Sequence, residues 1–415
     1  MDLFVIIALL VIVSAFYSYI NARYVKLPGT IGIVLIAVIA SVVTIFVDSI
    51  DPHSARYLTL LAKNIDFSST VLNIMLGFLL FSGSFTLNTR RLKKEMRPIF
   101  LLSTLGVIIS TLVFGWLFYG ITLLFHIHIP VVYCLVFGAL ISPTDPVAVG
   151  AIIKNSRLPV NLETIISGES LFNDGIGLVL FITLLEFARS GEDNLDWVKA
   201  ALLFIKEVFG GICLGVFLGY VAFRLMKSIT DFQTIVLVSV ALVMSISVIA
   251  AYLHFSIPLA VVTAGLFAGN RSINMDSTEH SHQALEKFWQ LIDEMLNTIL
   301  FVMIGLQMIN LPYLENYWLI GGIGIVVILI ARWVSIMMPL MFFRKIASNT
   351  IKNVNILTWA GLRGGISIAL ALSLPYGSYR YVILAGAYFI VIFSVIVQGL
   401  TLNKVIDASI PKTED

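Results

Sequence analysis

The chain has 415 residues, of which 59% are hydrophobic and only 12% are charged, with a formal net charge of +2. Its mean hydropathy is +0.99, whereas soluble globular proteins hold about 45–50% apolar and about 25% charged residues. A water-soluble protein of this length could not bury so much apolar surface. The composition therefore excludes a soluble fold and predicts an all-α polytopic membrane protein.

The apolar residues form about thirteen runs, most of them near the ~20 residues that a membrane-spanning helix needs. The short tail after the last run leads us to expect no soluble regulatory domain, and nothing suggests a nucleic-acid partner. The predicted spans lie near residues 3–20, 29–47, 67–86, 98–124, 130–153, 163–187, 199–223, 232–253, 257–270, 285–308, 316–343, 353–374 and 379–403.

The basic residues predict the orientation of these spans. Loops after odd-numbered spans, together with the C-terminal tail, hold eighteen Lys and Arg residues, whereas the other loops hold five. Cytoplasmic loops of membrane proteins carry the excess of Lys and Arg. We therefore expect the N-terminus outside and the C-terminus inside.

The fifth span contains two prolines, Pro143 and Pro146, on either side of Thr144 and Asp145. Each proline removes a backbone donor and clashes with the preceding turn, so the helix must break here. Broken backbone at that depth survives only where it lines a cavity or is buried in protein. Asp145 would cap the second half-helix at its positive end. The alternative is a simple proline kink that Asp145 caps, without a binding site. Such a kink would not require a second carboxylate nearby.

The sixth span supplies that carboxylate in the stretch Ser167-Gly-Glu-Ser-Leu-Phe-Asn-Asp-Gly175. Ser170 and Asp174 are four residues apart and share a helix face, as do Glu169 and Asn173. A hydroxyl and a carboxylate are hard oxygen ligands that suit a small hard cation.

Two arginines lie inside later spans, where a charge costs at least about 2.5–3.5 kcal/mol on insertion scales. Arg332, in the eleventh span, is the natural partner of Glu169, and we interpret the two as a structural ion pair. Arg363, in the twelfth span, lies within Gly361-Leu-Arg-Gly-Gly365, where Gly364 and its neighbours weaken the helix. Close packing through small residues could explain the glycines alone, but not the arginine.

The broken fifth and twelfth spans occupy corresponding positions if two six-span repeats flank the seventh span. Interrupted segments in corresponding positions of two halves indicate a transporter binding site. We therefore predict two inverted repeats with two broken, crossing helices, and Arg363 would neutralise the carbonyl ends exposed at the crossing.

These motifs resemble, in order and over essentially the whole chain, those of the cation:proton antiporters of the NhaP or sodium–proton exchanger type. The matching stretches are Thr144-Asp145-Pro146, Gly168-Glu-Ser-Leu-Phe-Asn-Asp-Gly175, Ala331-Arg332 and Gly361-Leu-Arg-Gly-Gly365. The resemblance implies an NhaA-like fold, a homodimer, and a multi-pass protein of the plasma membrane, here of a prokaryote. It also implies a mobile core, about 98–187 and about 316–403, that moves against a scaffold of spans 1–3 and 7–10.

By the same resemblance, the chain exchanges Na⁺ or Li⁺ for protons and serves pH homeostasis, as a transporter rather than an enzyme and with no cofactor. Asp145 and Asp174 would bind cation and proton in competition, with Ser170 and the Thr144 carbonyl as further Na⁺ ligands. The pair Asn173-Asp174 looks like the electroneutral, one-for-one branch. Prokaryotic members often carry a glutamate in the third span, where this chain has Ser82, which leaves the preference for a cation open.

Three other functions are compatible with parts of the pattern. A K⁺/H⁺ antiporter of the same fold is the nearest. A passive cation channel would show no obligatory coupling to protons. An intramembrane aspartyl protease also needs two mid-membrane aspartates, but its chemistry expects a Gly-x-Gly-Asp stretch, which Phe172-Asn-Asp-Gly175 does not supply.

Overall fold

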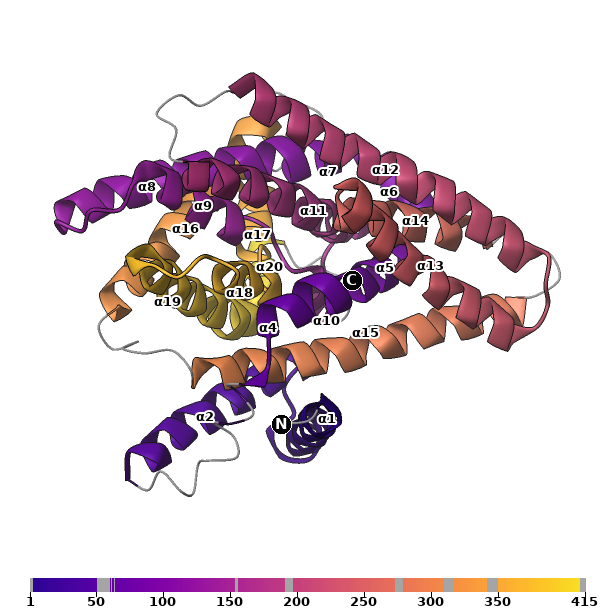
Figure 1. Cartoon of the computed structure of the whole chain (residues 1–415), viewed down its shortest axis with the longest axis horizontal. Coiled ribbons are helices and arrows are strands. Elements are labelled where there is room, and N and C mark those ends of the chain that lie inside the picture. Colours follow the sequence, from indigo (N-terminus) through magenta and orange to yellow (C-terminus); the bar gives the residue numbers. More distant parts are fainter. Residues whose placement is uncertain are drawn as a thin grey trace.

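The computed structural model describes residues 3–50, 60, 62, 64–153, 156–190, 197–272, 279–309, 317–341 and 350–410. Within these ranges the regular structure is helical, as predicted (Figure 1). Several of the basic residues used for orientation lie outside the described residues: Arg56, Lys63, Lys154, Arg344, Lys345 and Lys412.

Ten helical stretches of the described residues are long and apolar enough to cross a membrane. They coincide with all the predicted spans except the fifth, the ninth and the twelfth. Those three segments are helical too, but the ninth is short and the other two are broken. The number of thirteen spans and the orientation stay predictions.

The first four predicted spans contain several short π-helical turns between α-helices. The elements are α1 (Leu3–Ile20), a π-turn (Asn21–Val25), α2 (Gly29–Ile50), α4 (Phe67–Ser69), a π-turn (Thr70–Met75), α5 (Leu76–Thr86), α6 (Thr89–Lys94), α7 (Met96–Leu101), a π-turn (Leu102–Gly106) and α8 (Val107–Leu124).

The rest of the chain contains both interrupted helix pairs, α9 with α10 and α17 with α18. The elements are α9 (Val131–Ile141), α10 (Pro146–Ile153), α11 (Val160–Ser190), α12 (Trp197–Lys227), α13 (Phe232–Leu253), α14 (Ile257–Ser272), α15 (Glu279–Met308), α16 (Trp318–Met341), α17 (Thr350–Trp359), α18 (Gly365–Leu372), α19 (Ser378–Phe393), a π-turn (Ser394–Gln398) and α20 (Gly399–Ser409).

Two groups of helices pack among themselves. Helices α8, α9, α11, α16 and α19 form one group, and α2, α5, α12, α14 and α15 form the other, with α11 contacting both. In Figure 1, α12 runs along the upper right edge and α15 crosses the lower part of the bundle, above α1 and α2. The groups come from the predicted core and scaffold spans respectively, although relative motion stays a prediction.

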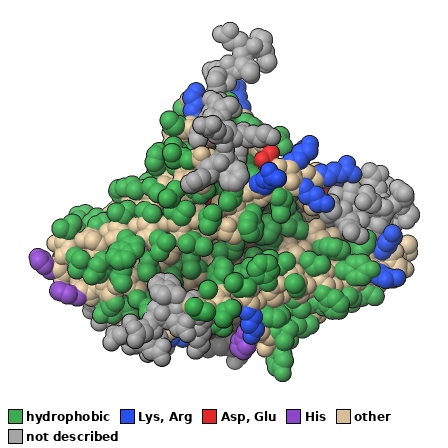
Figure 2. Space-filling view, turned by 90° about the horizontal axis from the view of Figure 1, so that it is seen from above, with side chains coloured by type: hydrophobic (Ala, Val, Ile, Leu, Met, Phe, Trp, Pro, Cys, Tyr) green, Lys and Arg blue, Asp and Glu red, His purple; other side chains and the backbone are tan. Residues whose placement is uncertain are grey.

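The outer surface of the bundle is apolar. Large hydrophobic side chains on α12 and α13 are exposed, among them Phe209, Phe217 and Leu237. Figure 2 shows hydrophobic side chains over most of the visible face, with Lys and Arg gathered mainly near its upper and right margins. Such a surface needs lipid as its solvent, since soluble monomers rarely expose large contiguous apolar patches.

Candidate functional site

The two broken helices meet at their breaks. The backbone N–H of Asp145, between α9 and α10, donates a hydrogen bond to the carbonyl of Leu362, between α17 and α18, at 2.7 Å. Pro146 is the first residue of α10, where its missing N–H leaves nothing unsatisfied. The predicted crossing of the fifth and twelfth spans is therefore present.

Asp145 caps the half-helix that follows it. The Ala148 N–H donates to the Asp145 Oδ1 at 3.3 Å, so the carboxylate lies at the positive end of α10. The side chain is 9% exposed. Helix α11 approaches the same break closely, because a Cβ on Gly177 would overlap the ring of Pro143. The break thus lies directly against the helix that carries the second carboxylate.

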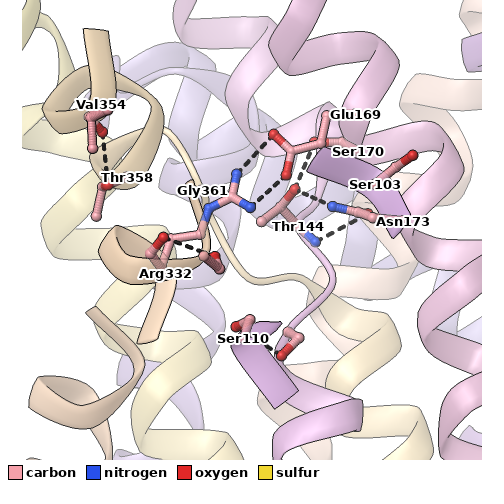
Figure 3. Close-up of polar contacts among 12 residues, drawn as sticks. Ser103, Ser110, Thr144, Glu169, Ser170, Asn173, Arg332, Val354, Thr358 and Gly361 are labelled. Atoms are coloured by element: carbon pink, nitrogen blue, oxygen red, sulfur yellow. Dashed lines mark hydrogen bonds and ion pairs between the residues drawn. The ribbon is translucent and has the colours of Figure 1, made fainter. Parts of the chain in front are cut away.

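Ser170 and Asn173, on α11, hold Thr144 in place (Figure 3). The hydroxyls of Thr144 and Ser170 are 2.8 Å apart. The Asn173 amide donates to the Thr144 hydroxyl at 2.8 Å and accepts the Thr144 N–H at 3.3 Å. An aspartate could not make this two-way contact, because it offers no N–H donor. The Thr144 carbonyl accepts no hydrogen bond among the described residues, so its oxygen can face a cation.

Asp174 follows Asn173 and is 3% exposed. Its Oδ2 has no hydrogen-bond partner among the described residues, and it lies close enough to Asp145 for their charges to interact. Buried polar atoms are nearly always hydrogen-bonded, so an unsatisfied carboxylate oxygen needs an explanation such as a proton or an ion. The structure brings the predicted Asp145, Thr144, Ser170, Asn173 and Asp174 together at one place.

Glu169 and Arg332 form a bidentate ion pair between α11 and α16. Arg332 Nη2 donates to Glu169 Oε2 at 2.9 Å, and Nη1 contacts Oε1. Both side chains are buried, and Figure 3 shows the pair beside Thr144. The expected contact is present, and it engages both carboxylate oxygens of Glu169. Its role as a structural brace stays a prediction.

The second break is built around Arg363, which is buried. Its Nη1 donates to the Gly361 carbonyl at 3.1 Å, and its backbone N–H donates to the Ser394 hydroxyl at 2.8 Å. The guanidinium therefore lies against a backbone carbonyl of the break that follows α17, and its role in neutralising carbonyl ends at the crossing stays a prediction. Gly364 touches the first break, because a Cβ on it would overlap the carboxylate of Asp145.

Ser82 lies apart from these contacts. Its hydroxyl donates to the Trp289 carbonyl at 2.7 Å, which ties α5 to α15. The side chain is 2% exposed. Helix α5 therefore supplies no carboxylate at this position. The Ser82 hydroxyl donates its proton to the Trp289 carbonyl.

A cavity of about 560 Å³ leads toward the crossing. Its lining includes Pro146 on α10 and Leu171 on α11, which adjoin Asp145 and Ser170 in the chain. It lies at the ends of α1, α2, α5, α10 and α11 that carry predicted cytoplasmic loops. The cavity thus leads from that predicted side to residues next to the crossing.

The sequence interpretation missed residues on the wall of this cavity. Asp293, Glu294 and Asn297 line it from α15. Two adjacent acids in the middle of the apolar run 285–308 were a signal for them, because intramembrane acids are rare without a function.

Two broken helices that cross inside an apolar helical bundle, with buried carboxylates beside them, define a secondary transporter. Residues 9–407 match the family model described as "Sodium/hydrogen exchanger, transmembrane". The chain is 38% identical to the Na⁺/H⁺ antiporter NhaP of Pseudomonas aeruginosa, over 97% of this chain and 96% of the relative. It is 32% identical to the Na⁺/H⁺ antiporter NhaH of Halobacillus aidingensis, over 98% and 97%.

The fold is also similar to a solved structure, the sodium proton antiporter MjNhaP1 from Methanocaldococcus jannaschii. The TM-score is 0.78 at 18% identity, covering 98% of this chain and 99% of the other. The chain belongs to the sodium/hydrogen exchanger family.

Gly364 gives a test of the crossing. We expect Gly364→Ala to lower ion-driven proton movement by roughly tenfold or more, because the added methyl displaces the Asp145 carboxylate from its place, and small displacements of a reacting group have large effects. The measurement is the initial rate of ion-driven proton movement in proteoliposomes that contain each variant. Gly322→Ala is the matched control, since a Cβ there meets nothing within 4 Å. Equal rates for the two variants would contradict this role.

Proposed function

We propose that this chain is a secondary active antiporter that exchanges Na⁺ for H⁺, with Li⁺ as a further substrate. The observation that carries the proposal is the buried Asp174 carboxylate, with an unsatisfied oxygen beside Asp145 at the crossing of two broken helices. The family and the printed activity of the two bacterial relatives support it. The protein is a multi-span membrane protein, and its similarity to bacterial Na⁺/H⁺ antiporters supports a place in the plasma membrane.

Competition for one set of oxygens supplies the coupling. Asp145 and Asp174 offer carboxylates, and Ser170 and the Thr144 carbonyl offer neutral oxygens, which together suit a small hard cation. A proton on a carboxylate removes the charge that holds the cation, and a bound cation favours the ionised carboxylate. Asn173 fixes Thr144 against α11 without adding a charge. Exchange follows if only the cation-loaded or proton-loaded site changes sides.

Alternating access then requires the site to face each side in turn. The cavity is lined by residues next to the crossing and lies on the predicted cytoplasmic side, which supports an inward-facing conformation. We propose that α7–α11 and α16–α20 move as the core against the remaining helices, which also form the contact of a homodimer. The Glu169–Arg332 pair would keep α11 and α16 together during that movement.

Transport in proteoliposomes with each cation tests this function. We expect an imposed Na⁺ gradient to drive proton movement, and we expect an imposed membrane potential to leave the rate unchanged, because one charge moves each way. A response to K⁺ alone would point to K⁺/H⁺ exchange. Cation flux without proton movement would contradict antiport, and a rate that follows the potential would contradict one-for-one exchange.

A further inference from the structure

A second and much smaller cavity lies beside Arg332. The polar part of its lining comes from α16, from α17, from the second break and from the π-turn before α20: Arg332, Thr358, Gly361, Arg363 and Gln398. The rest of its lining is apolar and belongs to α16 and α19. It shares no lining residue with the cavity of about 560 Å³. Its own volume of about 10 Å³ leaves room for one water-sized ligand.

Two guanidinium groups on this lining each keep an N–H donor without an acceptor. The Nε atoms of Arg332 and Arg363 are buried and have no hydrogen-bond partner among the described residues. The two side chains are 4% and 2% exposed. Glu169 engages both terminal nitrogens of Arg332 but not its Nε. A buried donor without an acceptor is costly, above all on a charged group, so both Nε atoms call for a ligand.

Both guanidinium groups lie against Gly361. A Cβ on this glycine would come within 2.9 Å of the Arg332 Nε. The Gly361 carbonyl accepts a hydrogen bond from the Arg363 Nη1 at 3.1 Å. Because Gly361 itself lines the cavity, the two unpartnered Nε atoms border the same small space. One acceptor in that space can therefore serve both arginines.

The neutral polar side chains of the lining are engaged elsewhere. The Thr358 hydroxyl donates to the Val354 carbonyl at 2.7 Å. The Gln398 Oε1 accepts the Ser394 hydroxyl at 2.7 Å, and its Nε2 donates to the Trp359 carbonyl at 3.3 Å. Within the described part of the chain, neither side chain accepts a hydrogen bond from an arginine Nε. The lining thus supplies the donors but not the acceptor.

The charges around the cavity are also unequal. Arg332 and Arg363 lie close enough for their positive charges to interact. Among the described residues, Glu169 is the only carboxylate that forms an ion pair with either of them. Buried charges are normally paired, yet here two guanidinium groups share one carboxylate. An acceptor placed between the two groups would satisfy both N–H donors and reduce their mutual repulsion.

We propose that this cavity binds one small hydrogen-bond acceptor, a water molecule or a chloride ion, which bridges the Nε atoms of Arg332 and Arg363. Water matches the volume of the cavity. Chloride would also balance the charge, but it is larger and requires the flexible arginine side chains to shift slightly. The ligand connects α16, which the ion pair joins to α11, with the second break. The site does not take the transported cation, because the groups that line it donate positive charge.

A density map of the wild-type protein, at a resolution that shows ordered water, tests the site. We expect a peak within hydrogen-bond distance of both Nε atoms. Ordered water elsewhere in the bundle, with no peak here, would overturn the proposal. Crystals grown with NaBr in place of NaCl distinguish the two ligands. An anomalous peak at this place identifies a halide, whereas an ordinary peak without anomalous signal identifies water.

Thermal unfolding in detergent gives a second readout for chloride. At constant Na⁺ concentration, chloride in place of gluconate should raise the wild-type unfolding midpoint by about 2–4 °C if chloride is the ligand, because a ligand of the folded state stabilises it. Arg363→Gln should lose this rise. Lys404→Gln should keep it, since Lys404 is exposed on α20 and does not line the cavity. A rise that Arg363→Gln retains in full would overturn chloride as the ligand of this site.

Discussion

Asp174→Asn is expected to abolish Na⁺-driven proton movement in proteoliposomes. Asparagine has nearly the same shape, but it can neither ionise to hold a cation nor carry a proton. Because the Asp174 Oδ2 has no hydrogen-bond partner among the described residues, the substitution breaks no contact that holds α11. The variant should therefore fold and insert normally while its transport is lost.

Asp407→Asn is the control for this substitution. Asp407 is exposed on α20 and does not line the cavity, and its variant should transport at the wild-type rate. Thermal unfolding in detergent should show that both variants are as stable as the wild type. Substantial exchange by a well-folded Asp174→Asn protein would contradict the role of Asp174.

Removing either partner of the Glu169–Arg332 pair is expected to destabilise the protein strongly. Glu169→Ala or Arg332→Ala should each lower the free energy of unfolding by about 3–5 kcal/mol, because each leaves a buried charge without its partner. The double variant should lose less than the sum of the two, since no unpaired charge is left. Denaturant unfolding in detergent measures all three differences.

A second double-mutant cycle, in which Arg332→Ala is combined with a substitution of an unpaired acid, serves as the control. It separates the loss of the ion pair from a general loss of stability. Glu163 lies in the first turn of α11 and forms no ion pair among the described residues. The effects of Glu163→Ala and Arg332→Ala should therefore add to within about 0.5 kcal/mol, as those of independent sites do. If the effects of Glu169→Ala and Arg332→Ala on the free energy of unfolding were equally additive, the pair would not brace α11 against α16.

The breaks in the fifth and twelfth spans could be predicted because proline and glycine act on the backbone where they stand. Pro143 and Pro146 end a helix whatever surrounds them. The contact between the breaks, from the Asp145 N–H to the Leu362 carbonyl, followed only from the symmetry of the two halves. The Glu169–Arg332 contact could be predicted too, since a buried guanidinium needs a carboxylate and few were available.

Other features depend on the packing of several helices, which periodicity does not give. The two-way contact of Asn173 with Thr144 joins residues 29 apart in the chain. The cavity is lined from several predicted spans at once, so the sequence could mark Asp293 and Glu294 as unusual acids in an apolar run but not place them on the cavity wall. Ser82 was noted for the carboxylate it lacks, but its bond to the Trp289 carbonyl emerged only from the fold.

The measurement that tests competition most directly is proton release on Na⁺ binding by purified protein in weakly buffered detergent solution. The wild type should release protons when Na⁺ is added, in proportion to the Na⁺ bound, because a cation at Asp174 and Asp145 displaces a proton from the same oxygens. Asp174→Asn should release none from this site. Stoichiometric Na⁺ binding by the wild type without proton release would contradict exchange by competition.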